Sequence, residues 1–358
     1  MKLKQYEIHR VHLPLPHPIG DSQVRFVDHR GTILELETET GLRGVGFQVQ
    51  QGMPTAALKE LKEQFEFQTW PGLLGANPFT LANRIERPRG GNVGASPFAL
   101  VVETALWDLM AKHLNLPLYR LLGGTRTRVR AYGSTLDFHL TDDEFRAKLI
   151  RFREQGFKAM KIKVGHPDVE WDLARMAIAR QVMGPEPDLM IDSNEAWSPK
   201  EALLRLHRYR DEGFEIYWME DPIDRNDLDG YRMLCAEIPF TRINTGEYLG
   251  FSGKRRLLEA AAVDVLNVHT SISESRTAAR LAGDYGIPVS MGNTPLETGV
   301  HAAVSFPECL YMEFSDLMWN VLAQEPIRFE DGHAIAPDRP GHGLELDRDA
   351  LAHYSVPG

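Results

Sequence analysis

Three carboxylate residues recur along the second half of the chain at nearly constant spacing. Asp192 lies in the stretch MIDSN, Glu220 in WMEDP and Glu247 in NTGE, so the intervals are 28 and 27 residues. One strand–helix unit has about this length, which predicts that each carboxylate ends its own strand at a common barrel mouth. Converging carboxylates repel one another, and a hard divalent cation that prefers oxygen ligands removes that repulsion. The pattern therefore predicts a Mg²⁺ site.

Two lysines precede this series. Lys161 and Lys163 belong to the run KIKVG, and side chains two positions apart in a strand point to the same face. We expect both ammonium groups at the same mouth, where crowding lowers the pKa of each and makes a lysine a general base near neutral pH. A metal ion and a lysine base suit removal of the weakly acidic proton α to a carboxylate, because the metal stabilises the resulting enediolate.

The elements that must position these residues follow a repeating pattern. After residue 128, short β-rich runs alternate with amphipathic stretches, which indicates strand–helix units. Eight strands are predicted, the number that closes a parallel barrel: 129–134, 159–165, 189–194, 216–222, 242–247, 263–269, 288–293 and 310–316. A doubly wound open sheet is the competing arrangement, but no strand is followed by its glycine-rich phosphate-binding motif.

The flanking segments indicate a second unit. Residues 1–50 alternate apolar and polar residues between turns, as expected for an antiparallel meander. A helix is predicted over 97–114 with Ser96 as its N-cap, and Gly123-Gly124 marks a boundary. We therefore expect an α+β capping domain at 1–125 and a barrel domain at 126–324. The segment 325–358 is too short to fold alone, so we expect it to return to the capping domain.

Composition excludes several classes of protein. With 40 Lys and Arg against 50 Asp and Glu, the net charge is −10, and no basic cluster offers a surface for nucleic acid or for an anionic membrane. No run approaches the roughly 18 apolar residues of a membrane span, and the N-terminus lacks the apolar core of a signal peptide. These features predict a cytoplasmic protein that acts on a small molecule.

The chain resembles the enolase superfamily, specifically its mandelate racemase and muconate lactonizing enzyme family. The resemblance rests on the KIKVG lysines, on Asp192 followed by Ser-Asn, on Glu220 in MEDP and on Glu247 in TGE. It implies an α/β fold, a modified TIM barrel (β/α)7β with an N-terminal α+β capping domain. It also implies one Mg²⁺ per subunit and a homo-oligomer, from dimer to octamer. Lys163 is then the base, and Lys161 assists by orienting the substrate carboxylate or lowering the pKa of its neighbour.

The far side of the mouth departs from the family pattern. A glutamate as the third ligand is typical of the mandelate racemase subgroup, which usually adds a His–Asp dyad at the ends of the sixth and seventh strands. Here Asp264 opens the sixth strand, and the expected histidine position reads VSMGN (289–293). His269 ends the sixth strand instead. It is either a second acid or base opposite Lys163 or a structural histidine bonded to loop backbone.

Four further residues are candidate substrate contacts. Glu313, at the end of the eighth strand, matches a position at which the racemase-like family keeps a carboxyl group that hydrogen-bonds the substrate carboxylate. Asn194, two residues beyond Asp192, could reach a substrate hydroxyl. Arg25 and His29 lie in the segment 16–30, which in the resembling family is a loop that closes over the active site.

The resemblance favours one reaction over two alternatives. Many mandelate racemase-like proteins dehydrate acid sugars, so we expect dehydration of a polyhydroxy (sugar) acid after Lys163 removes its α-proton. A racemase, epimerase or cycloisomerase is the first alternative, because the histidine that elimination commonly uses as an acid is missing. A barrel that only binds a metabolite is the second, and the intact lysines and carboxylates disfavour it.

Overall fold

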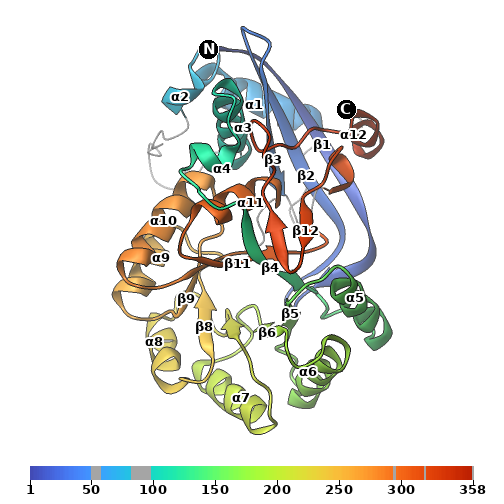
Figure 1. The fold of residues 1–358 in the computed structure, drawn as a ribbon, viewed down its shortest axis with the longest axis vertical. Coiled ribbons are helices and arrows are strands. Elements are labelled where there is room, and N and C mark those ends of the chain that lie inside the picture. The colour runs from blue at the N-terminus through green and yellow to red at the C-terminus, as the bar shows by residue number, and fades with distance from the viewer. Residues whose placement is uncertain (50–57, 82–97, 293–295, 318–319, 357–358) are drawn as a thin grey trace.

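An antiparallel sheet opens the fold (Figure 1). The computed structural model describes residues 1–49, 58–81, 98–292, 296–317 and 320–356. Three strands form a meander in chain order, with Ile8 opposite Leu34: β1 (Leu3–Gly20), β2 (Arg25–Thr38) and β3 (Arg43–Val49). The meander predicted for residues 1–50 is confirmed over the residues that the structure describes.

A long helix packs across this sheet. α3 (Ala99–His113) covers β3 and is accompanied by α1 (Leu58–Gln68), η1 (Trp70–Gly72), α2 (Pro78–Leu81) and α4 (Leu118–Leu121). The close approach requires glycine in β3, because a Cβ atom on Gly46 would lie 1.9 Å from the carbonyl oxygen of Val101. The helix predicted at 97–114 is therefore present, while its predicted N-cap Ser96 lies outside the described residues.

Eight parallel strands close into a barrel. They follow chain order from β4 to β11, and β11 pairs back with β4 through Met312 opposite Ala131. This pairing excludes an open doubly wound sheet and confirms the predicted barrel. The strands are β4 (Arg128–Ser134), β5 (Ala159–Lys163), β6 (Asp188–Asp192), β7 (Trp218–Glu220), β8 (Arg242–Thr245), β9 (Val265–Asn267), β10 (Val289–Met291) and β11 (Cys309–Phe314). Helices connect successive strands: α5 (Asp142–Glu154), α6 (Val169–Met183), α7 (Pro199–Asp211), α8 (Leu228–Glu237), α9 (Phe251–Glu259), α10 (Ile272–Asp284) and α11 (Leu296–Ser305).

Bulky side chains fill the barrel interior. Tyr132, Met190, Trp218 and Tyr311 form one buried cluster, in which the Tyr132 and Trp218 rings meet edge to face with centroids 5.4 Å apart. Met190, Trp218 and Tyr311 each stand two positions before an acidic residue of the same strand. Because strand side chains alternate, those acids occupy the next interior layer toward the mouth. In the part of the chain that the structure describes, no helix is long and apolar enough to cross a membrane.

The C-terminal residues contact both units. β12 (Arg328–Glu330) and β13 (His333–Ile335) form a hairpin, and β13 pairs antiparallel with the barrel strand β4. η2 (Asn320–Leu322) and α12 (Arg348–Tyr354) lie nearer the N-terminal sheet, where Val11 bridges to Ser355. Leu344, Leu346 and Leu351 join an apolar cluster with residues of β1, β2 and β3. Within the segment 325–358 the hairpin thus extends the barrel sheet, and the residues from 342 onward pack on the cap. The boundaries at residues 125 and 324 stay a prediction.

A buried histidine joins the cap, the barrel and the C-terminal segment. Nδ1 of His301, on α11, accepts a hydrogen bond from the backbone N–H of Tyr119 at 3.2 Å, and its Nε2 lies 2.8 Å from the carbonyl oxygen of His342. Burial lowers the pKa of His301 to about 4. Because both ring nitrogens contact the backbone, His301 is a structural residue.

We expect His301 to make the fold sensitive to acid. It stays neutral in the folded protein, whereas the unfolded chain takes up a proton at this residue below about pH 6.5. The free energy of unfolding should therefore fall as the pH drops from about 6.5 toward 4, by about 3 kcal/mol when complete. Urea unfolding at about pH 7.5 and pH 4.5 should show a smaller acid loss for His301→Gln than for the native protein. Equal losses would contradict this role.

The β1–β2 hairpin extends from the cap to the barrel mouth (Figure 1). The segment 16–30, predicted as a loop, is mostly strand, because the β1–β2 pairing resumes at Ile19 opposite Phe26 and leaves only residues 21–24 as the turn. The backbone N–H of Gly20 donates to the carbonyl oxygen of Leu136 at 3.0 Å, and a ring nitrogen of His139 lies 3.0 Å from the carbonyl oxygen of Val24. The turn therefore rests on the loop that follows β4.

Candidate active site

The three predicted metal ligands lie at the mouth ends of neighbouring strands. Asp192 is the last residue of β6, Glu220 is the last residue of β7, and Glu247 follows β8 by two residues. All three side chains are buried, and Glu247 is the most exposed at 8%. Their order around the mouth follows the parallel pairing of β6, β7 and β8. The positions predicted from the 28- and 27-residue spacing are therefore those that the fold gives them.

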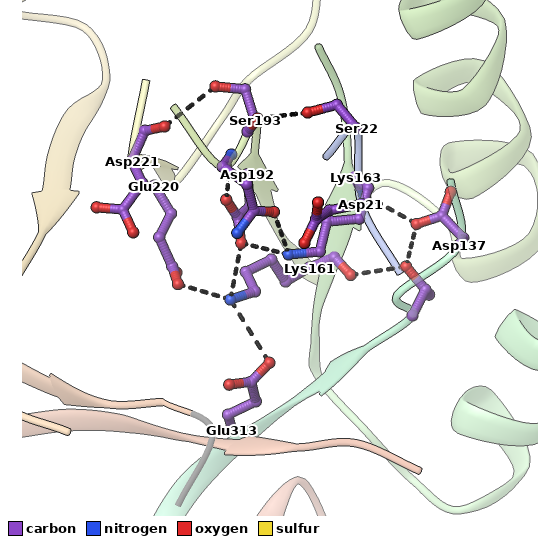
Figure 2. A network of polar contacts seen from close by, with 12 residues as sticks. Asp21, Ser22, Asp137, Lys161, Lys163, Asp192, Ser193, Glu220, Asp221 and Glu313 are labelled. Atoms are coloured by element: carbon purple, nitrogen blue, oxygen red, sulfur yellow. Dashed lines mark hydrogen bonds and ion pairs between the residues drawn. The ribbon is translucent and has the colours of Figure 1, made fainter. Parts of the chain in front are cut away.

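Both lysines project from the same face of β5 onto these acids (Figure 2). Lys161 Nζ donates to Glu220 Oε1 at 2.7 Å and lies 3.3 Å from Asp192 Oδ2. Lys163 Nζ donates to Asp192 Oδ2 and to Asn194 Oδ1, each at 2.6 Å. Glu313, on β11, approaches Lys161 from the opposite side, with 3.5 Å between its Oε1 and the ammonium nitrogen. The lysines and acids thus form one buried network.

The pKa values of the lysines differ from the sequence prediction. Crowding of two ammonium groups predicted lowered values. Burial lowers the pKa of Lys163 and so does Lys161, but Asp192 raises it, and the net shift is upward. Burial also lowers the pKa of Lys161, yet Glu220 and Glu313 raise it well above its usual range. Without a metal, both lysines stay protonated. The reason is that carboxylates lie close to each ammonium group, and their effect on the lysine pKa outweighs the effect of the other lysine.

The backbone turns sharply beyond the acids. Asn194, Glu195 and Asp221 have φ angles of 49°, 66° and 39°, in the left-handed region that asparagine and aspartate tolerate better than most residues. The Asn194 N–H donates to Asp192 Oδ1 at 2.9 Å, which fixes the carboxylate. Strands β6 and β7 consequently end earlier than predicted, at residues 192 and 220, and the side chains that follow them are redirected over the mouth.

The mouth holds more acidic groups than the two lysines can pair. Burial raises the pKa of Glu247 to about 8 and that of Glu220 well above its usual range. Glu247 has no ion pair or hydrogen bond to another described residue. Among the described residues, ligand oxygens of the three acids do not all lie within 4.8 Å of one another, and the Lys161 ammonium contacts both Asp192 and Glu220. A set of three carboxylates short of positive charge fits a hard cation such as Mg²⁺.

Another group of possible ligands lies on the N-terminal sheet. Ligand atoms of Glu7, His9 and Glu35 all lie within 4.8 Å of one another. Arg348 pairs with both oxygens of Glu35, at 2.5 and 2.7 Å. This bidentate ion pair already satisfies the buried carboxylate, so the group is explained as a contact between α12 and the sheet.

His269 follows β9 at the rim of the mouth. Its backbone N–H donates to Asn267 Oδ1 at 3.0 Å, and its carbonyl oxygen accepts from Lys254 Nζ at 3.3 Å. Burial lowers the pKa of His269 to about 4, and the neighbouring Lys254 lowers it further. The imidazole is therefore neutral at physiological pH. Asp264 lies at the other end of β9, where its carboxylate accepts from the Ile243 N–H at 2.8 Å, so it is no dyad partner for His269.

The four predicted substrate contacts divide into two groups. Asn194 and Glu313 belong to the lysine–acid network described above. Arg25 is exposed at the start of β2. His29 is buried within β2 and lines a separate cavity of about 190 Å³ with Leu13, Asp316 and Tyr354, apart from the barrel acids. His29 lies there because the strand continues through it where a closing loop was expected, and its contact with substrate stays a prediction.

Sequence analysis missed several residues of the site. Asp137, in the loop after β4, accepts from the backbone N–H of Lys163 at 2.8 Å. Ser22 and Asp21, at the tip of the β1–β2 hairpin, reach the mouth from the cap (Figure 2). Their contacts join segments more than 25 residues apart, and Ser22 contacts a residue 171 positions away. The only local signal was the turn-forming run Gly-Asp-Ser at 20–22.

The fold and this site define a class of protein: a capped parallel barrel with two strand-borne lysines facing acids at its mouth. Residues 6–123 match the family model of the mandelate racemase / muconate lactonizing enzyme N-terminal domain, and residues 144–350 match the enolase C-terminal domain-like model. The chain therefore belongs to the mandelate racemase / muconate lactonizing enzyme family of the enolase superfamily.

Named relatives cover nearly the whole chain. L-talarate/galactarate dehydratase of Salmonella typhimurium is 29% identical over 361 residues, which are 94% of this chain and 87% of that protein. D-galactarolactone cycloisomerase of Agrobacterium fabrum is 30% identical over 390 residues, with 100% of both chains covered. A solved structure from Mesorhizobium loti has a TM-score of 0.94 at 44% identity, covering 99% of this chain and 95% of that one. The Salmonella dehydratase liganded with Mg and L-lyxarohydroxamate has a TM-score of 0.85 at 26% identity, covering 99% and 93%.

Proposed function

We propose that this protein is a Mg²⁺-dependent enzyme that removes the α-proton of a carboxylate substrate and dehydrates a polyhydroxy acid. The observation that carries the proposal is the projection of Lys161 and Lys163 from one face of β5 onto acids that end β6 and β7. Enediolate formation needs a base, a fixed cation and a set of metal ligands within one active site. A relative named for dehydrating talarate and galactarate supports the reaction class.

Each residue of the network has a distinct task in this reaction. Mg²⁺, held by Asp192, Glu220 and Glu247, would supply charge stabilisation for the enediolate. With Asp192 committed to the metal, its charge would hold the proton on Lys163 less strongly, while the neighbouring Lys161 lowers the pKa of that base. Asn194 Oδ1, at 2.6 Å from Lys163 Nζ, orients the amine toward the α-carbon. Lys161 stays protonated and binds the substrate carboxylate beside Glu313.

Dehydration also needs an acid for the departing hydroxyl, and we assign this role to His269, whose pKa of about 4 in the substrate-free protein the negative charge of a bound substrate would raise. We expect His269→Asn to keep exchange of the α-proton with solvent while lowering formation of the dehydrated product by about 10²- to 10⁴-fold. Product formation and α-deuteration, followed by NMR in the same D₂O samples, separate the two steps. Parallel loss of exchange and product would show that His269 serves only the structure.

An isomerase is the second candidate, and one observation favours it. The lowered pKa of His269, about 4, leaves no positive charge on the imidazole to assist a leaving hydroxyl. Ring opening of a lactone needs no such acid, because its leaving group is a carboxylate, and one relative is named a cycloisomerase. Incubation of a sugar-acid and sugar-lactone library with the protein and Mg²⁺ distinguishes the two. A product lighter than its substrate by one water supports dehydration, whereas products of unchanged mass support the isomerase.

We propose further that the enzyme works in the cytoplasm as a homo-oligomer. The cap exposes large apolar side chains on and near its helices, among them Phe67 at 79% and Leu74 at 57%. A second copy of the chain would cover these side chains. Light scattering of the purified protein tests the proposal, and a monomer at micromolar concentration would overturn it.

A further inference from the structure

Asp21 brings a carboxylate from the cap to the barrel mouth. It opens the β1–β2 turn, is 9% exposed, and accepts hydrogen bonds at Oδ1 from the N–H groups of Gln23 and Val24 at 2.7 and 3.0 Å. Figure 2 shows its side chain beside Lys163. Against the effect of burial, Asp21 adds to the larger effect of Asp192 in raising the pKa of Lys163. Glu247 raises the pKa of Tyr248, and Asp21 adds to that effect as well. Lys163 ends β5, so the Asp21 carboxylate lies at the mouth beside this lysine.

The barrel holds this turn in place. Ser22 Oγ donates to the carbonyl oxygen of Ser193 at 3.2 Å, and Gln23 Nε2 donates to that of Asn194. Both acceptors belong to the turn that follows the metal-ligand candidate Asp192. Contacts with the barrel turn beside Asp192 therefore fix the position of the Asp21 carboxylate.

The described residues around Asp21 offer a second substrate carboxylate little positive charge. Lys161 is already assigned to the carboxylate beside the reacting carbon, and Lys163 to the α-proton. Arg225 forms a bidentate pair with Glu195, at 2.5 and 2.6 Å. Lys254 is 1% exposed and donates to the carbonyl oxygens of Leu249 and His269. Arg25, the nearest basic residue in the hairpin, is exposed.

We propose that Asp21 makes the site selective for polyhydroxy acids with one carboxylate and rejects diacids of the same stereochemistry. A distal carboxylate would face the fixed charge of Asp21, whereas a distal hydroxyl can donate a hydrogen bond to its remaining oxygen. The inference rests on the proposed function and narrows its substrate class. It also separates this chain from the relative named for galactarate, which is a diacid.

The test compares matched pairs such as galactonate with galactarate and gluconate with glucarate. We expect kcat/KM of the native protein to be about tenfold or more higher for the monoacid than for the diacid. In Asp21→Asn this ratio of monoacid to diacid should fall by at least the same factor, because the variant accepts the diacid. Asparagine keeps the Oδ1 acceptor that closes the turn and removes only the charge. Asp28→Asn is the matched control, because it removes a carboxylate charge from the same hairpin at a position that pairs with Arg30 and His12, so it should leave the ratio near the native value.

Three results would overturn the inference: a native preference for the diacid, a ratio unchanged in Asp21→Asn, or an equal change in Asp28→Asn. Thermal shifts produced by each acid in the presence of Mg²⁺ give the same comparison without turnover. If no variant turns over any acid, the proposed reaction fails, and the thermal shifts still decide the role of Asp21.

Discussion

Replacing Lys163 with methionine should lower kcat by about 10²- to 10⁴-fold, the usual contribution of a general base. Methionine has nearly the same length and no amine, so the variant keeps the packing of the buried β5 strand while losing the group that accepts the proton. Steady-state kinetics on the substrate found by library screening measure the effect. The acid limb of the native pH–rate profile, which reports the ionisation of the base, should disappear with the amine.

Two further variants locate the effect at this residue. Lys158→Met removes an exposed lysine five residues earlier and should leave kcat within about twofold. Lys161→Met should raise KM more than Lys163→Met does, because Lys161 is proposed to bind the substrate carboxylate. If Lys163→Met retained native kcat while Lys161→Met abolished it, the roles of the two lysines would be reversed.

Mg²⁺ should stabilise the native protein strongly and should not stabilise a Glu247→Gln variant. Glu247 is buried and has no ion pair among the described residues, so the metal-free chain carries the cost of an unpaired carboxylate or of the proton that neutralises it. A cation that binds only the folded state adds about 2.7 kcal/mol when its concentration is a hundred times its Kd. Thermal unfolding with excess Mg²⁺ and with EDTA measures the difference.

The same variant also distinguishes a ligand from an ordinary buried acid. In EDTA, Glu247→Gln should be as stable as the native protein or more so, because glutamine needs no neutralising charge. Glu237→Gln, at an exposed position of α8, should respond to Mg²⁺ as the native protein does. An undiminished Mg²⁺ shift in Glu247→Gln would remove Glu247 from the ligand set.

The barrel and the placement of its acids could be predicted because both depend on local periodicity. A strand places every second residue inward, and strand–helix units repeat at a nearly constant length, so Lys161, Asp192 and Glu220 could be assigned to one mouth before any contact was known. The ends of the strands were less predictable. They are set by left-handed residues such as Asn194 and Asp221, which no hydrophobic pattern marks.

Contacts between distant segments could not be predicted from the sequence. Asp21 and Ser22 reach the mouth only because a long hairpin crosses from the cap to the turn at Ser193. His29 was expected at the mouth, but strand pairing carries it to a different cavity. The predicted direction of the lysine pKa shifts was wrong for a related reason. That direction depends on whether an acid or the other lysine lies nearer to each ammonium group.

Exchange with solvent shows directly whether Lys163 removes a proton from the α-carbon of a carboxylate. The native protein with Mg²⁺ in D₂O should incorporate deuterium at the α-carbon of a monocarboxylic sugar acid, as observed by NMR and mass spectrometry. Lys163→Met should incorporate none above the uncatalysed rate, and EDTA should abolish exchange in the native protein. Exchange that persists in Lys163→Met, or that is insensitive to EDTA, would contradict the account.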